Sequence, residues 1–161
     1  METCASLEEY FYNRIQGCSL DGDIQAYLVM ILAKWARSQP DDAEPLAIAY
    51  MQALQTQGWP LREVADRALW WAGFAPHTMG PLVTRRYVEG IGMAAYAHFA
   101  KHASARVFWA LSESFSEAVE VVRDISRAHE DLSAMVSRAV AGNGADDDFL
   151  ERQGVFVLRR R

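Results

Sequence analysis

The sequence predicts an all-α fold, a single-domain bundle of about five or six helices that ends in one long helix. Apolar residues recur at three- and four-residue spacing along most of the chain. The one apolar run that could form a strand, 154–158, has no second strand to pair with. The 161 residues, 51% of them hydrophobic, are enough to bury one core. We therefore expect a helical bundle domain over residues 1–141 and a C-terminal tail over residues 142–161.

Caps, prolines and glycines divide the first part of the chain into five expected helices. Ser6 and Glu9 have the spacing of a capping box before the first helix, and Pro45 falls in the first turn of the third. Two prolines and two glycines between 73 and 81 predict a loop. The expected helices span residues 6–16, 21–38, 42–57, 59–73 and 82–102.

The fifth expected helix is rich in small residues, which allow a neighbouring backbone to approach closely. These residues are Gly90, Gly92, Ala94, Ala95, Ala97 and Ala100. We interpret this segment as the close-packed central helix of the bundle.

A heptad pattern runs from residue 108 to residue 139, and Ser104 is the expected cap of this long helix. The a positions are Phe108, Phe115, Val122, His129 and Val136, and the d positions are Leu111, Ala118, Ile125, Leu132 and Ala139. No e or g position is charged, so the helix presents a wide apolar face that suits contact with two or more helices. The helix either completes the bundle or projects from it and pairs with a second copy.

Residues in the second half of this long helix are candidates for a partner interface. His129 is the one polar residue in the heptad seam, where it could set the register or respond to pH, and Leu132 and Val136 follow it. A partly exposed position for His129 near the frayed end of the helix is the simpler alternative.

Adjacent aromatic residues form a second candidate interface. Trp70 and Trp71 point about 100° apart on a helix, so they cannot both face one narrow core stripe, and Phe74 follows them. At least one tryptophan is expected at a second interface. That interface is either internal, against the N-terminal helices, or available to a partner or an apolar ligand.

Charge and motif content argue against several functional classes. A net charge of -5 disfavours nucleic acid as a partner. Residues 61–68 with Gly73 have some likeness to a helix-turn-helix, but Leu69 stands where a small residue is needed and Pro76 interrupts the second helix. A DNA-binding regulator of this kind is therefore only a second alternative.

No sequence motif names a reaction, and we expect no catalytic residues, cofactor or metal. Neither a Gly-x-Ser-x-Gly element nor a phosphate-binding glycine loop occurs. His98 and His102 lie four positions apart and could face one ligand, but no further metal-ligand spacing completes a site. A bundle that binds a small molecule or cofactor through these histidines is the first alternative function.

The N-terminal residues resemble neither a signal peptide nor a membrane span, and the longest apolar stretch is residues 27–33. Cys4 and Cys18 would lie too far apart on a helix to form a disulfide. We therefore expect a cytoplasmic protein without a membrane partner. The favoured function is a non-catalytic protein-interaction module, of the adaptor, inhibitor, chaperone or immunity type, that binds a protein partner, a second copy of itself as a homodimer, or both.

Overall fold

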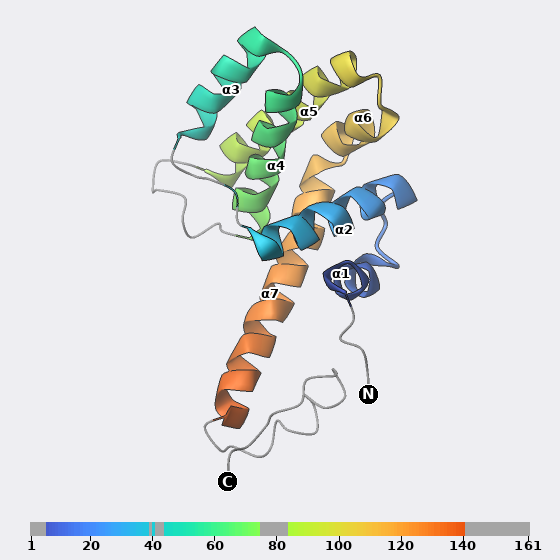
Figure 1. The fold of residues 1–161 in the computed structure, drawn as a ribbon, viewed down its shortest axis with the longest axis vertical. Coiled ribbons are helices and arrows are strands. Elements are labelled where there is room, and N and C mark those ends of the chain that lie inside the picture. The colour runs from blue at the N-terminus through green and yellow to red at the C-terminus, as the bar shows by residue number, and fades with distance from the viewer. Residues whose placement is uncertain (1–5, 39, 41–43, 75–83, 141–161) are drawn as a thin grey trace. The chain divides into compact units, whose positions relative to one another are not determined.

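The computed structural model describes residues 6–38, 40, 44–74 and 84–140, and all regular structure in these ranges is helical (Figure 1). Side chains of the last helix are described up to residue 128 and at residue 130. The chain divides into two compact units, residues 1–123 and 124–161. The predicted all-α class is confirmed for the described residues. The expected boundary between bundle and tail, near residue 141, lies at the edge of what the structure describes.

Two helices at the N-terminal end pack against each other, α1 (Leu7–Ile15) and α2 (Gly22–Arg37). The hydroxyl of Ser6 accepts a hydrogen bond from the backbone N–H of Glu9 at 3.2 Å, so the predicted N-terminal cap is confirmed. The two helices bury apolar side chains in the core, namely Phe11, Ile15, Ile24, Leu28, Ile31, Leu32 and Trp35.

A helical hairpin follows, formed by α3 (Leu46–Thr56) and α4 (Trp59–Gly73). The two-residue connection turns sharply because both of its residues have positive φ, 47° at Gln57 and 125° at Gly58. The third helix begins later than predicted, because Pro45 is its N-cap with an extended ψ of 135° and does not lie in the first turn. The expected helical residues 42 and 43 lie outside the described part of the chain.

The next helix, α5 (Arg85–Ala103), packs along α4. Thr84 caps its N-terminus and accepts a hydrogen bond from the N–H of Tyr87 at 3.2 Å. Ser104 ends α5 in a left-handed conformation with a φ of 50°. The prediction that Ser104 caps the following helix is therefore wrong, and Ala105 occupies that N-cap position. Most of the predicted 73–81 loop lies outside the described residues.

The predicted helix from residue 108 onward is interrupted at Ser114, which separates α6 (Arg106–Glu113) from α7 (Phe115–Val140). The φ and ψ of Ser114 are -102° and 21°, outside the helical range. The interruption lets α6 pack along α5 while the ring of Phe115 lies 5.9 Å from that of Tyr96. Apolar periodicity continues across the break, so the sequence pattern alone gives no sign of it.

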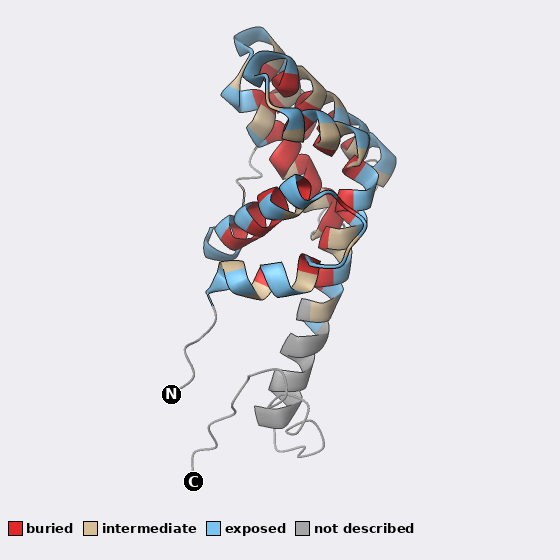
Figure 2. Cartoon of the chain, turned by 90° about the vertical axis from the view of Figure 1, so that its right-hand side faces the viewer, coloured by how far each residue is buried: buried red, intermediate tan, exposed pale blue. Residues whose placement is uncertain are grey.

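Close helix contacts in the first unit depend on glycine. A Cβ added at Gly92 of α5 would overlap the ring of Phe115, and one added at Gly73 of α4 would overlap Val122 of α7. A Cβ added at Gly90 would have no other atom of the packed neighbours within 4 Å. The close contact at Gly92 is thus with a side chain, the ring of Phe115, and not with the neighbouring backbone that the small residues led us to expect. Figure 2 shows the buried residues on the inward sides of the helices of this unit.

Among the described residues, no helix has both the length and the apolar character needed to cross a bilayer.

The two glycines of α5 provide a matched test of this packing. We expect Gly92→Ala to lower the free energy of unfolding by about 1–3 kcal/mol, because Phe115 must move. Gly90→Ala should raise it by about 0.5–1 kcal/mol, because it only removes backbone freedom from the unfolded chain. Urea unfolding midpoints measure both. Equal effects of the two substitutions would contradict this packing.

Candidate functional site

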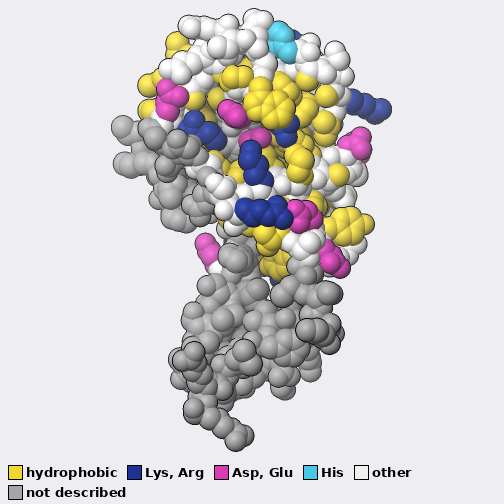
Figure 3. Space-filling model, viewed as in Figure 1, with side chains coloured by type: hydrophobic (Ala, Val, Ile, Leu, Met, Phe, Trp, Pro, Cys, Tyr) yellow, Lys and Arg dark blue, Asp and Glu magenta, His cyan; other side chains and the backbone are white. Residues whose placement is uncertain are grey.

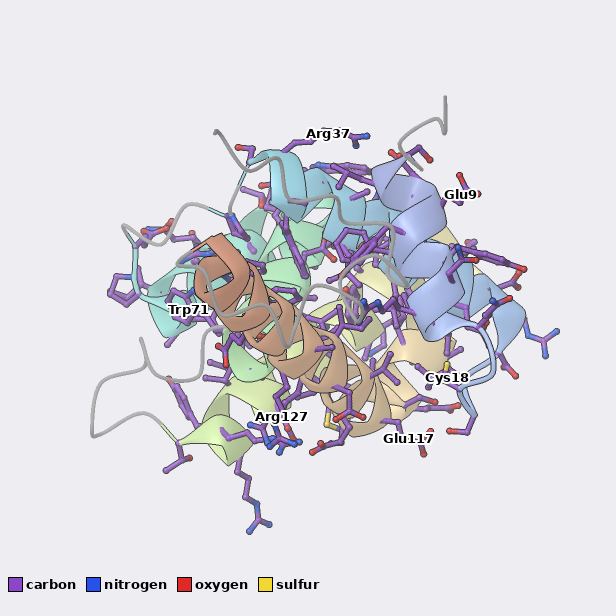
Figure 4. All side chains as sticks on the ribbon, turned by 90° about the horizontal axis from the view of Figure 1, so that it is seen from below. Glu9, Cys18, Arg37, Trp71, Glu117 and Arg127 are labelled. Carbon is purple, nitrogen blue, oxygen red and sulfur yellow. The ribbon has the colours of Figure 1, made fainter. Side chains whose placement is uncertain are left out.

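The aromatic residues predicted as an interface lie along the last turns of α4. The Trp70 ring stacks on Phe74 with centroids 4.7 Å apart and meets Trp35 of α2 edge-on at 5.2 Å. Trp71, labelled in Figure 4, is half-buried. The guanidinium of Arg67 lies 5.4 Å from its ring centre. Trp70 therefore contacts an N-terminal helix of its own chain, whereas Trp71 lies beside a charged group at the surface.

The two histidines of α5 lie in different surroundings. The His98 ring is half-buried and 6.3 Å from that of Tyr50 on α3, whereas His102 is exposed in the last turn. No group of three or more His, Cys, Asp or Glu side chains suited to a metal occurs in the described part of the chain.

The interface candidates His129, Leu132 and Val136 belong to α7, and their side chains lie outside the described residues.

A buried polar network that the sequence did not reveal joins three helices. The carboxylate of Asp66 on α4 accepts hydrogen bonds at Oδ1 from the phenols of Tyr27 on α2, at 2.5 Å, and Tyr96 on α5, at 2.6 Å. Asp66 is 8% exposed. Arg62, one turn earlier on α4, donates its Nε–H to the Tyr27 oxygen at 2.9 Å and lies 3.8 Å from Asp66 Oδ2. We refer to these four residues as the Asp66 network.

Aromatic rings surround the positive charge of this network. The guanidinium carbon of Arg62 lies 4.4 Å from the ring centre of Trp59, 5.1 Å from that of Tyr27 and 5.6 Å from that of Phe108. Ring faces attract a cation, and the attraction is greater where water is displaced. Arg62 therefore balances the charge of Asp66 at the boundary between the core and the exposed Trp59.

Burial controls the protonation of the network. It raises the pKa of Asp66 to about 6, although the Tyr27 and Tyr96 hydrogen bonds and the Arg62 charge oppose this shift. Burial, followed by the negative charge of Asp66, raises the pKa of both phenols. The network can hold or release one proton at Asp66, but its burial keeps substrates away, so we assign it a structural role. The only sequence signal was the four-residue spacing of Arg62 and Asp66, which also occurs on ordinary exposed helices.

The surface of α3 is unusual because the helix contains no charged residue. Its inward side chains Leu46, Ala49 and Ala53 are buried, yet Ile48 and Met51 on the other side are 48% and 66% exposed. With Gln55 they form a line at three- and four-residue spacing, which we call the outer stripe of α3. Figure 3 shows hydrophobic side chains at the surface over this helix. A solvent-facing helix side normally carries charge.

A pocket of about 280 Å³ lies between α3 and α4. Small apolar side chains, Ala49, Ala53 and Val64, form its buried part. Polar and exposed side chains complete its lining, namely Glu44, Gln52, Thr56, Pro60, Glu63 and Arg67. Acidic and basic side chains are visible among hydrophobic ones on the face formed by these helices (Figure 3). The pocket thus combines an apolar floor with charges of both signs.

No family model, no curated protein and no solved structure matches this chain.

The Asp66 network makes stability depend on pH. A carboxyl group whose pKa is raised to about 6 in the folded state binds a proton more readily than in the unfolded chain. The folded state therefore gains stability from this group as pH falls from about 7 to about 4, by roughly 2 kcal/mol. We expect Asp66→Asn to remove this gain, measured as the difference between mutant and wild-type urea unfolding curves across that range.

The matched control is Asp23→Asn, at an exposed position in the first turn of α2. Its pH profile should follow that of the wild type. An Asp66→Asn profile that keeps the wild-type slope would rule out the raised pKa.

Proposed function

We propose that this chain is a non-catalytic protein-interaction module, and that it associates with a second copy of itself through the outer stripe of α3. The observation that carries the proposal is the exposure of Ile48 and Met51 on a helix without a single charged residue. A helix that is apolar on two sides is normally covered on both. An adaptor, inhibitor, chaperone or immunity-type regulator would use such a surface.

The absence of charge favours a second copy of the chain as the partner. In a two-fold symmetric contact, residues near the axis meet their own copies, so any charged residue there faces a like charge. α3 can lie against itself without this repulsion. Gln55 is exposed beside the apolar residues, and an amide can both donate to and accept from its own copy.

The size of the stripe limits the strength of this contact. α3 has 11 residues and is therefore about 16 Å long. A surface of this length is smaller than a standard interface, so α3 alone supports an association in the micromolar range. The heptad-patterned residues His129, Leu132 and Val136 of α7 remain a second proposed contact, supported by their sequence spacing.

Substitution in the outer stripe tests the proposal. We expect the wild-type chain to be dimeric at about 100 μM in light scattering behind size-exclusion chromatography, and Met51→Asp to be monomeric because two carboxylates would meet at the axis. The melting temperature measured at low concentration should not change, because Met51 is exposed in the single chain.

Met30→Asp is the matched control, because Met30 is also an exposed methionine, 48% exposed, but lies on α2. It should leave the dimer intact. A wild-type monomer at this concentration would overturn self-association. A dimer that tolerates Met51→Asp but is lost on Leu132→Asp would overturn the role of α3 and place the contact on α7.

A further inference from the structure

The pocket between α3 and α4 contains a guanidinium that its surroundings only partly satisfy. Arg67 donates from Nη2 to the backbone carbonyl of Glu44 at 2.5 Å and lies over the Trp71 ring. Its Nε is buried and has no hydrogen-bond partner among the described residues. Buried donors in native proteins are nearly always paired, so an unpaired one calls for an explanation. These contacts hold the guanidinium in place, and no carboxylate among the described residues forms an ion pair with it.

The second charge of the pocket, Glu63, also has no ion-pair partner in the described part of the chain. Glu63 lies one turn before Arg67 on α4, a spacing at which the two side chains can meet. Both line the pocket, yet no ion pair joins them, and neither pairs with another described side chain of opposite charge. A fixed cation and an anion that has no ion-pair partner among the described side chains therefore stand about one helical turn apart beside the same space.

The floor of the pocket suits an apolar group. Ala49 and Ala53 lie one turn apart on α3, and their small side chains, together with Val64 of α4, leave the space open. The volume of about 280 Å³ lies near the lower end of the range, about 300–1,000 Å³, found for ligand pockets. The space is therefore suited to a small molecule with few heavy atoms.

We infer that this pocket binds a small zwitterion with an apolar body, the chemistry of a free α-amino acid with an aliphatic side chain. Its carboxylate pairs with Arg67, because a guanidinium matches the geometry of a carboxylate. Its ammonium pairs with Glu63, and its side chain lies on Ala49, Ala53 and Val64. With Glu44 and Glu63 both in the lining, a ligand with only negative charge is disfavoured.

This inference does not depend on self-association. The pocket uses Ala49, Gln52, Ala53 and Thr56 of α3, whereas the outer stripe consists of other residues of the same helix. A monomeric chain can therefore bind the ligand, and a dimer can form without it.

Changes in backbone amide chemical shifts provide the test, with three small-molecule probes that share the same branched alkyl chain. L-leucine carries both charges, 4-methylpentanoate lacks the ammonium, and L-leucinamide lacks the carboxylate. We expect leucine at up to about 10 mM to shift the amides of Gln52 and Thr56 with saturation, and each single-charge probe to bind at least about tenfold more weakly.

Two variants test which side chain of the pocket pairs with which charged group of the ligand. Glu63→Gln should weaken leucine binding about tenfold, because the ammonium loses its partner, and should not weaken the binding of 4-methylpentanoate, because it removes a negative charge that repels an anion. Arg67→Lys should weaken both, because it keeps the charge but loses the planar donors. The control is Glu117→Gln on α7, an exposed residue outside the pocket lining (Figure 4). It should bind leucine as the wild type does.

Saturable shifts that depend on Glu63 and Arg67 support the zwitterion site. Equal affinity for leucine and 4-methylpentanoate would overturn it in favour of a simple anion site. The absence of saturable shifts with all three probes would overturn ligand binding at this pocket altogether.

Discussion

The buried carboxylate of Asp66 is the interaction on which the arrangement of the first unit depends. It accepts hydrogen bonds from phenols on α2 and α5 while it is itself part of α4, so one atom, Oδ1, links three helices. Hydrogen bonds are directional, whereas apolar contacts tolerate sliding and rotation. The network therefore specifies how these helices are rotated about their axes. Without the carboxylate, two buried phenols would lose their acceptor at a cost of about 1–3 kcal/mol each.

Packing around this network leaves little freedom to the neighbouring helices. The Phe115 ring fits against the bare backbone of Gly92, and it also contacts Tyr96, a member of the network. Phe108 contacts Tyr27, Tyr96 and Phe99 and lies within reach of Arg62. α3 contributes no residue to this network, whose members belong to α2, α4 and α5. Its outer stripe is exposed and its alanine-lined side borders the pocket, and these are the two surfaces that we propose for binding.

Local sequence signals predicted the helices well, and long-range contacts account for what they missed. The Ser6 cap and the Gly58 turn depend on neighbouring residues only, so they could be read directly. Ser104 was assigned to the wrong helix because serine is a common N-cap residue. In the structure it ends α5, where its backbone has a left-handed conformation. The break at Ser114 follows from the packing of α6 and Phe115 on α5. The Asp66 network was not predictable, because its partners are distant in sequence and tyrosines give no signal of their own.

The distances in sequence between the members of the network affect how the chain folds. Tyr27 lies 39 positions before Asp66, and Tyr96 lies 30 positions after it. The α3–α4 hairpin and the α5–α6 pair need only short loops, so they can form early. The carboxylate meets both phenols only after these pieces have docked with α2. We therefore expect loss of the network to leave the folding rate nearly unchanged and to accelerate unfolding, so that this buried acid determines how long the folded chain lasts.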